Sequence, residues 1–566
     1  MKKYFFIVLL FLCSTTLTAQ SDWNQTWKMA TNPFQEPQST SGMHIVKAGF
    51  DTDNDGWGEF IASTCDKDSN FVMMYEASGD NEYELVWSWM FPYRANSYNG
   101  IAVGDADNNG VVEILVTQPT NDAGISPPRL WIFEWNGVDG ENNYGNYSSG
   151  VCEPHGTWNY NLEDGIDFRP MSLMVEDIDQ DGKNELITGV RGEPDRNVRE
   201  IIVSNVTGTF TTFAAWNIEF RTENEGGALY SVTTGDLDGD GNREIHGLLW
   251  DLFTLRIYEA TGPDTYELQS EIIELDPVID YGAWDGVAVT DVDKNGTNEM
   301  YIAGMNLPGD NYHTIFFIEG ETDNSTIDSS DVKVLMELSH PKGGGFNNIE
   351  ICDPDGDGNL SLMLAGRYTG LVYDIEYKGT GNPADSSSWD VSIAYDIFAT
   401  AANDLGISAD SAISVISPRI AYGSYGGDMD NDGKNEYVFV NYSSDFEDWS
   451  NDAYVYIIEN GTALAISPGN NSIPANFTLS QNYPNPFNPQ TNITYSLKES
   501  SFINLTVYDM LGKKVRTLIN ELKNAGNYSI IWDGLADDGL PAASGLYYYK
   551  LKSNGAQISK SMILIR

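Results

Sequence analysis

The chain has 566 residues, 41% of them hydrophobic, and this length predicts several domains or a repeat array rather than one core. Its formal net charge is −52, from 31 Lys and Arg against 83 Asp and Glu. Nucleic-acid binding needs a basic surface, so this charge excludes nucleic acid as an expected partner.

The chain begins with a stretch typical of exported proteins. Residues 1–19, MKKYFFIVLLFLCSTTLTA, contain two lysines, an apolar run and a small final residue, which predicts a secretory signal peptide. No other run of about 18 apolar residues follows, so we expect no transmembrane segment. The remaining cysteines, Cys65, Cys152 and Cys352, are too few for a disulfide framework, and a single Cys65–Cys152 bridge stays an open alternative.

An acidic pattern, Asp-x-Asp-x-(Asp/Asn)-Gly, occurs seven times between residues 51 and 433. Alternating carboxylates, a Gly that allows a tight bend and an acid at position 9 provide the hard oxygen ligands of a Ca²⁺ site. An EF-hand would place its closing Glu at position 12 between two helices. Here short β-rich runs flank every loop, so the loops are predicted to join the strands of hairpins.

The expected metal ligands occupy positions 1, 3, 5 and 9 of these loops. They are Asp51, Asp53, Asp55, Glu59, Asp105, Asp107, Asn109, Glu113, Asp177, Asp179, Asp181, Glu185, Asp236, Asp238, Asp240, Glu244, Asp291, Asp293, Asn295, Glu299, Asp353, Asp355, Asp357, Asp428, Asp430, Asp432 and Glu436. The two Asn residues keep an oxygen at position 5 without its charge. In the sixth loop Ser361 replaces the position-9 acid and Pro354 interrupts the pattern, so we expect that site to be the weakest.

The spacing of the loops predicts the architecture. Successive loops begin 54 to 75 residues apart, and each unit has about four strand-like runs, as in a propeller blade. We therefore predict an all-β chain with a seven-bladed β-propeller over residues 20–468. The last unit has three clear strands, so we expect residues 22–30, DWNQTWKMA, to close the ring there. Residues 463–468, ALAISP, are the rival closing strand.

The loops and their strands resemble FG-GAP/VCBS-type repeats, as in the integrin α-subunit propeller, over about residues 40–460. The resemblance implies up to seven structural Ca²⁺ ions, held in hairpins on one face of the propeller. It does not imply an enzymatic activity.

A separate module follows a short linker, 469–475. In residues 476–566 alternating strands joined by Gly and Asn turns predict a small Ig-like β-sandwich. The segment resembles the type A sorting domain of the type IX secretion system through Asn485-Pro486-Phe487-Asn488-Pro489, Val507-Tyr508-Asp509 with Gly512, Trp532-Asp533-Gly534, Gly545 with Tyr547, and Lys560. The resemblance implies the secretion machinery as a partner and a secreted or outer-membrane surface location. A plain Ig-like accessory domain is the alternative.

The connections between blades are expected on the face opposite the metal loops, and they hold many of the few cations. The expected ligand-binding residues there are Arg94, Arg169, Arg191, Arg221, Lys342, Arg367, Arg419 and Trp284. Arginine suits bidentate recognition of carboxylates and aromatic rings stack on sugars, so we expect a glycan or a surface protein as ligand. Pairing of these cations with neighbouring acids is the alternative.

Catalytic patterns are missing from the sequence: H-E-x-x-H, G-x-S-x-G and P-loop motifs do not occur, and no catalytic residue is assigned. His155, in the insertion 136–169, and His340 are the bases that a secreted, lyase-like polysaccharide-degrading enzyme would need. We therefore expect a binding or adhesion module, with that enzyme as the alternative and a purely structural adhesin as a third reading.

Overall fold

The computed structural model describes most of the chain outside the first 22 residues. The described residues are 23–29, 43–64, 70–93, 98–119, 128–146, 152–161, 168–192, 198–211, 215–222, 229–249, 253–275, 281–305, 312–339, 345–367, 369–408, 411–412, 420–441, 455–461, 478–479, 491–497, 501–509, 513–523, 526–532, 534–536, 542–543, 545–553 and 556–564. The predicted signal peptide, the linker, His340 and the rival closing strand lie outside them.

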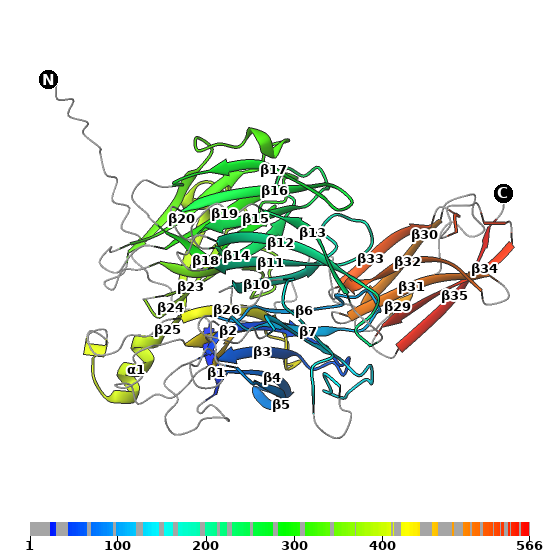
Figure 1. The fold of residues 1–566 in the computed structure, drawn as a ribbon, viewed down its shortest axis with the longest axis horizontal. Helices are drawn as coiled ribbons and strands as arrows, with labels where there is room; N and C mark the ends of the chain where they lie inside the picture. Colours follow the sequence, from blue (N-terminus) through cyan, green and yellow to red (C-terminus); the bar gives the residue numbers. More distant parts are fainter. Residues whose placement is uncertain are drawn as a thin grey trace. The chain divides into compact units, whose positions relative to one another are not determined.

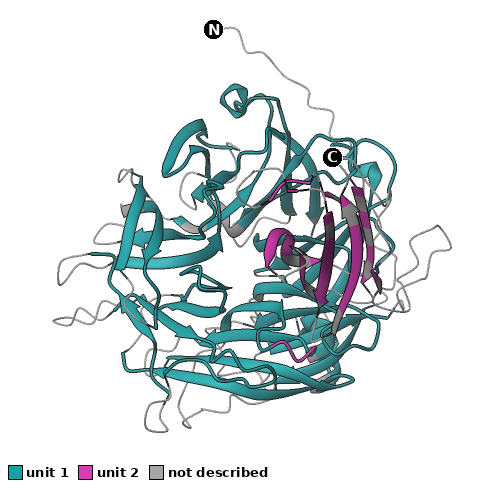
Figure 2. Ribbon diagram, turned by 90° about the vertical axis from the view of Figure 1, so that its right-hand side faces the viewer, with its two compact units in different colours: residues 1–53, 57–463 teal, residues 54–56, 464–566 magenta. Residues whose placement is uncertain are grey.

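The chain divides into two compact units, coloured teal and magenta in Figure 2. The first comprises residues 1–53 and 57–463, and the second comprises residues 464–566 together with 54–56. Both are built from antiparallel β-sheets, which confirms the all-β expectation. Among the described residues, no helix is both long and apolar enough to span a bilayer.

The first unit contains five four-stranded sheets and one eight-stranded sheet (Figure 1). Three of the four-stranded sheets come first along the chain: β2–β5 (Met43–Phe50, Glu59–Thr64, Asn70–Gly79, Glu82–Phe91), β6–β9 (Ile101–Gly104, Glu113–Thr117, Leu130–Glu134, Gly156–Trp158) and β10–β13 (Phe168–Glu176, Glu185–Gly192, Val198–Thr207, Ala215–Arg221). In each of them, strands that are consecutive in sequence are neighbours in the sheet.

The rest of the first unit continues the same plan. The fourth sheet is β14–β17 (Leu229–Gly235, Glu244–Leu249, Thr254–Gly262, Thr265–Ile272). The eight-stranded sheet joins β18–β21 (Tyr281–Thr290, Glu299–Met305, Tyr312–Glu319, Lys333–Ser339) to β22–β25 (Phe346–Cys352, Ser361–Gly366, Leu371–Tyr377, Trp389–Asp396). A single parallel pairing, Asp285 with Asn348, links these two groups. The helices that are described from end to end are short: η1 (Asn324–Thr326), η2 (Ser386–Ser388) and α1 (Ile397–Leu405).

The last sheet contains the N-terminal strand. It holds β26 (Ile420–Gly427), β27 (Glu436–Asn441), β28 (Val455–Asn460) and β1 (Trp23–Met29). β1 is antiparallel to β28, from Trp23 opposite Asn460 to Met29 opposite Val455. This pairing confirms that the segment beginning at residue 22 supplies the fourth strand of the last group.

The core of the first unit lies between successive groups of strands. Separate apolar clusters join the second group to the third, the third to the fourth, the fourth to the fifth, the fifth to the sixth and the sixth to the last. One further cluster joins the last group to the first two, with Val438 and Ile457 beside Phe60, Tyr75 and Trp131. Each sheet therefore buries both faces against its neighbours, an arrangement typical of a β-propeller.

The second unit is a two-layered β structure. One sheet holds β29 (Thr478–Leu479), β30 (Thr491–Leu497) and β33 (Gly526–Trp532), and the other holds β31 (Ser501–Asp509), β32 (Lys514–Lys523), β34 (Gly545–Ser553) and β35 (Ala556–Leu564). Side chains of both sheets share one core, around a fully buried Trp532 whose indole N–H donates to the Leu535 carbonyl at 2.8 Å. Alternating strands of this length give the small sandwich that the sequence predicts.

Candidate metal sites

Each acidic loop joins the first two strands of its group. The seven loops connect β2 to β3, β6 to β7, β10 to β11, β14 to β15, β18 to β19, β22 to β23 and β26 to β27. The glycine at position 6 has φ between 88° and 94° in all seven, from Gly110 to Gly56. Side chains rarely adopt this conformation, which explains why the pattern requires glycine there.

The second loop illustrates how the chain holds its carboxylates. The backbone N–H groups of Asn109 and Gly110 donate to Asp105 Oδ1 and Oδ2 at 2.9 and 2.8 Å, and Ala106 N donates to Glu113 Oε2 at 2.7 Å. Glu113 is fully buried, and among the described residues its other oxygen, Oε1, has no hydrogen-bond partner. Asp105, Asp107 and Glu113 each present an oxygen within 4.8 Å of the others.

The same bonds recur in the other loops. The N–H of position 2 donates to the position-9 Glu in six loops, from Thr52, Ala106, Ile178, Leu237, Val292 and Met429, at 2.6 to 3.0 Å. One oxygen of the position-9 acid is buried without a hydrogen-bond partner, among the described residues, in Glu113, Glu185, Glu244 and Glu436. A buried acceptor without a donor is costly unless a cation or water meets it. The donor set therefore fits a hard divalent ion.

The electrostatics of the loops point the same way. Burial, assisted by neighbouring carboxylates, raises the pKa of Glu113 to about 10 and the pKa values of Glu185 and Glu436 to about 9. For Glu299 burial raises the pKa to about 7. The same cause raises the pKa of Asp428 to about 6. Without a cation these groups resist ionisation, whereas a bound divalent ion would favour their charged form.

The aspartate at position 3 also bonds to the next group of strands. Asp107 Oδ2 accepts from Phe210 N at 2.6 Å, and Asp179 Oδ2 accepts from Asp264 N at 2.5 Å. Asn324 N and Asn81 N donate in the same way to the Oδ2 atoms of Asp238 and Asp430, at 3.2 and 2.6 Å. A residue predicted only as a metal ligand therefore also ties neighbouring sheets together. Asn81 belongs to the first group and Asp430 to the last, so this contact closes the series.

Sequence reasoning missed a set of acids on the third strands. Glu134 on β8 lies directly opposite Glu113, and Glu76 on β4 lies opposite Glu59. The other members are Glu259, Glu319, Glu376 and Glu459. The available signal is a Glu after Tyr, Phe or Ile near the end of the third strand, as in Tyr75-Glu76 and Ile375-Glu376. Alone, that pattern is typical of any strand with one solvated face.

The sixth loop differs from the others at position 9. Ser361 is fully buried at position 9 and provides no carboxylate, while Gly358 N donates to Asp353 Oδ2 at 3.0 Å, as the corresponding glycine does in the second, third, fifth and last loops. The carbonyl of Pro354 accepts from Asn435 Nδ2 at 3.1 Å, so the proline lies against the last group of strands. Opposite Ser361 lies Glu376.

The cations predicted to bind a ligand fall into three sets. Arg169 on β10 and Arg191 on β11 lie directly opposite one another, each 8% exposed. Arg221 forms an ion pair with Glu200 at 2.5 Å, and Arg367 follows β23 and is partly buried. The remaining predictions, Arg94, Lys342, Arg419 and the side chain of Trp284, lie outside the described residues. The structure thus places Arg169 and Arg191 opposite one another on neighbouring strands. It pairs Arg221 with Glu200, as expected if these cations form ion pairs with neighbouring acids.

His155 lies on the side of the second metal loop. Its Nδ1 accepts from the backbone N–H of Glu134 at 3.1 Å, and burial lowers its pKa. It lines a cavity of about 540 Å³ together with Glu134, Trp135, Asn136, Asn143, Gly145, Asn146 and Thr211. The thiol of Cys152, three residues before His155, donates to the Tyr144 carbonyl at 3.0 Å. Cys65 lies outside the described residues, so a disulfide between Cys65 and Cys152 stays an open alternative.

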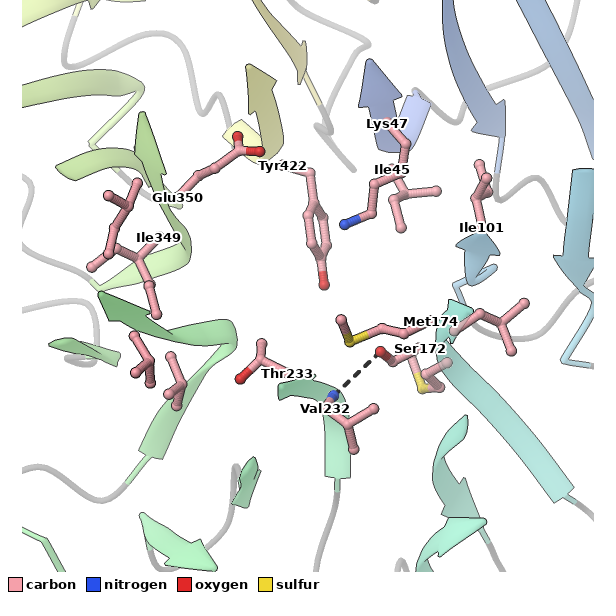
Figure 3. Close-up of a pocket in the computed structure, with 16 residues that line it drawn as sticks. Ile45, Lys47, Ile101, Ser172, Met174, Val232, Thr233, Ile349, Glu350 and Tyr422 are labelled. Atoms are coloured by element: carbon pink, nitrogen blue, oxygen red, sulfur yellow. Dashed lines mark hydrogen bonds between the residues drawn. The ribbon is translucent and has the colours of Figure 1, made fainter. Parts of the chain in front are cut away.

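A second cavity, of about 290 Å³, lies where the first strands of all seven groups meet (Figure 3). Residues of β2, β6, β10, β14, β18, β22 and β26 line it, and the side chains of Lys47, Met174 and Tyr422 point into it. Ser172 Oγ accepts from Val232 N at 3.2 Å across two neighbouring strands. The seven first strands therefore surround one central space.

Comparison with known proteins gives matches at both ends of the chain. A model of the FG-GAP-like repeat matches residues 51–116 and 177–246, which contain the first four acidic loops, and a model of the FlgD Ig-like domain matches residues 487–557. No curated protein matches the chain. Among solved structures it is similar to PorZ, a surface component of the type-IX secretion system of Porphyromonas gingivalis, with 11% identity and a TM-score of 0.30 over 93% of this chain and 82% of that one. The predicted FG-GAP-like repeats are thus confirmed for residues 51–116 and 177–246, and the predicted Ig-like tail for residues 487–557.

Proposed function

We propose that the chain is a Ca²⁺-stabilised, seven-bladed β-propeller that serves as a binding or adhesion module for a glycan or a surface protein. The observation that carries the metal assignment is the position-9 glutamate. One of its oxygens caps the loop and the other is buried toward two aspartates, as at Glu113. The seven-bladed ring is supported by the seven first strands around one cavity.

The residues at positions 1, 3, 5 and 9 would hold Ca²⁺, which supplies positive charge to a cluster that otherwise repels itself. The chain's own groups fix the geometry: backbone N–H groups orient the aspartates, and position 3 bonds to the next blade. Cation binding to the folded chain would stabilise it by mass action.

Thermal unfolding tests the metal assignment. Addition of Ca²⁺ to the chelated full-length chain should raise its melting temperature by many degrees, and Mg²⁺ at the same concentration should do much less, since it demands a smaller octahedral site. A melting temperature that is indifferent to both chelator and Ca²⁺ would contradict the assignment.

We further propose export through the type IX secretion system, with residues 476–566 as the sorting domain and the cell surface or the medium as destination. This rests on the motifs of the tail and on its Ig-like fold. Deletion of residues 476–566 should leave the protein in the periplasm, whereas normal surface delivery would favour a plain accessory domain.

The proposed ligand is an acidic glycan. Arg169 and Arg191 lie opposite one another on neighbouring strands, and two adjacent guanidinium groups in a chain of net charge −52 form a local cationic site that would suit the carboxylates of an acidic glycan. The alternative is a polysaccharide-degrading enzyme, for which the cavity beside His155 is the supporting observation. Size-exclusion chromatography of acidic polysaccharides incubated with the Ca²⁺-loaded protein separates the two. Co-elution of full-length glycan indicates a binding module, and shortened glycan indicates an enzyme.

A further inference from the structure

The glutamates near the ends of the third strands lie next to the acids of the metal loops. In five groups such a Glu lies directly opposite the position-9 Glu of the same sheet, as Glu134 opposite Glu113 and Glu76 opposite Glu59. Directly opposed residues share one face of an antiparallel pair, and like charges placed so are destabilising. Lys434 pairs with Glu459 at 2.5 Å, and Lys333 with Glu319 at 3.6 Å. In the second and fourth groups no lysine pair with the third-strand Glu is among the described ion pairs, and in the first group Asn142 Nδ2 donates to Glu76 Oε1 at 2.7 Å.

In the first group the distances between the carboxylate oxygens are short enough for one cation to bind all of them. Asp53, Glu59 and Glu76 each present a carboxylate oxygen, and the three oxygens lie within 4.8 Å of one another. Two ligands that bind one Ca²⁺ ion at about 2.4 Å can be no more than about 4.8 Å apart. The third-strand carboxylate is therefore within reach of an ion that positions 3 and 9 also hold.

The second group provides an independent sign of a ligand. Glu113 is fully buried, and its Oε1 has no hydrogen-bond partner among the described residues, although it shares a cluster with Asp105 and Asp107. Asn109 Nδ2 donates to Glu134 Oε2 at 3.1 Å and holds that carboxylate against the loop. Asn109 is the uncharged residue at position 5 of this loop, and its hydrogen bond holds the negative charge of Glu134 beside the loop.

The sixth group extends the argument to a loop that lacks the position-9 acid. Glu376 on β24 lies directly opposite the buried Ser361, in the register that Glu134 has to Glu113. Asp353 Oδ1 is also buried there without a hydrogen-bond partner among the described residues. The sixth group therefore has a carboxylate, that of Glu376, directly opposite the position where the other loops have their position-9 acid.

We propose that Glu76, Glu134, Glu259 and Glu376 are cation ligands of the first, second, fourth and sixth loops, and that Glu376 replaces the acid missing at Ser361. This inference rests on the proposed Ca²⁺ binding of the loops. It changes the expectation for the sixth loop, which then retains four carboxylates, Asp353, Asp355, Asp357 and Glu376, instead of three.

The Ca²⁺ content of the full-length chain, measured by mass spectrometry after equilibration at a fixed free Ca²⁺ concentration, tests the proposal. Glu376→Gln should lose one Ca²⁺ per chain, as should Asp353→Asn at position 1 of the same loop, a position that is aspartate in all seven loops. Glu267→Gln is the matched control: it removes the same charge from an exposed residue of β17 that lies opposite Glu259, one strand farther from its loop. It should keep the full content.

The outcomes separate this proposal from the one on which it rests. Loss of an ion from Asp353→Asn with full content in Glu376→Gln would overturn the third-strand ligand and leave the loops as Ca²⁺ sites. A wild-type chain that binds no Ca²⁺ would overturn both. As a second variant, Glu134→Gln should weaken one site about tenfold in a calorimetric titration without abolishing it, because Glu113 remains. Unchanged titration of that variant would contradict the proposal for the second loop.

Discussion

Trp23 and Asp374 join the first described strand of the chain to a group of strands some 350 residues later. The indole N–H of Trp23 on β1 donates to Asp374 Oδ2 on β24 at 2.8 Å, and the two side chains are 6% and 8% exposed. β1 itself pairs with β28. The N-terminal strand therefore completes the last sheet through its backbone and contacts the sixth group through a side chain.

Replacement of Trp23 by Phe should destabilise the protein by about 1–3 kcal/mol, because it leaves a buried carboxylate oxygen without its donor. Denaturant unfolding measures the change. Trp89→Phe is a matched control, since Trp89 Nε1 is buried and has no hydrogen-bond partner among the described residues. Equal losses in both variants would mean that ring volume, and not the bond to Asp374, matters.

The first and last acidic loops are in close contact, which predicts a second sensitive position. Gly58 N donates to the Met429 carbonyl at 2.8 Å, and a Cβ on Gly58 would lie 2.6 Å from Met429 Cβ. Gly58→Ala should therefore cost about 1–3 kcal/mol through overpacking. Gly156→Ala, whose Cβ would lie 3.6 Å from Ile132 Cδ1, is the control. If both variants melt like the wild type, the contact between these loops is not formed in solution.

The repeated loops made most of this fold predictable from sequence. Their pattern recurs at regular spacing, the glycine of each requires a positive φ, and the flanking runs have strand composition, so the hairpins and the all-β class follow from local chemistry. The N-terminal strand was predictable as well, because the last unit lacked a fourth strand and residues 22–30, DWNQTWKMA, have the two tryptophans of the first unit's outer-strand run, LVWSWMF.

The sites were less predictable where they depend on register. Nothing in the segment Ile375-Glu376 distinguishes a ligand from a solvated residue until β24 pairs with β23 and sets Glu376 opposite Ser361. The ion pair of Arg221 with Glu200 is equally a property of paired strands, β12 and β13. The register in which two strands pair cannot be read from composition or local spacing, even when the strands are consecutive in sequence.

The buried glutamates predict different pH dependences with and without metal. Burial raises the pKa of Glu113 to about 10 and that of Glu436 to about 9, whereas the ordinary pKa of a glutamate is 4.5. Between pH 4.5 and pH 9 the folded, chelated protein therefore binds more protons than the unfolded chain. The stability of the chelated chain should therefore fall as the pH rises from 5 to 8. In saturating Ca²⁺ this fall should be absent: the stability should be nearly constant above about pH 6 and should decrease towards pH 5, because protons then compete with the cation for the carboxylates.

Melting temperatures at pH 5, 6.5 and 8, with chelator and with Ca²⁺, measure both slopes. Glu113→Gln carries no titrating group at that position and should flatten the dependence of the chelated protein. Parallel slopes in the two conditions would contradict a role for these glutamates in cation binding.

Arg169 and Arg191 provide the prediction that bears most directly on the ligand. They lie opposite one another on β10 and β11, and an acidic glycan would be recognised through the planar guanidinium fork rather than through charge alone. The double change Arg169→Lys/Arg191→Lys keeps both charges and should reduce retention of an acidic polysaccharide about tenfold in affinity chromatography, because the bidentate geometry is lost. A neutral dextran column should show no difference.

Arg256→Lys, which alters an arginine paired with Glu271 at 2.6 Å, is the control and should retain the glycan. Undiminished retention by the double variant would mean that these arginines serve the fold through ion pairs, as Arg221 does with Glu200.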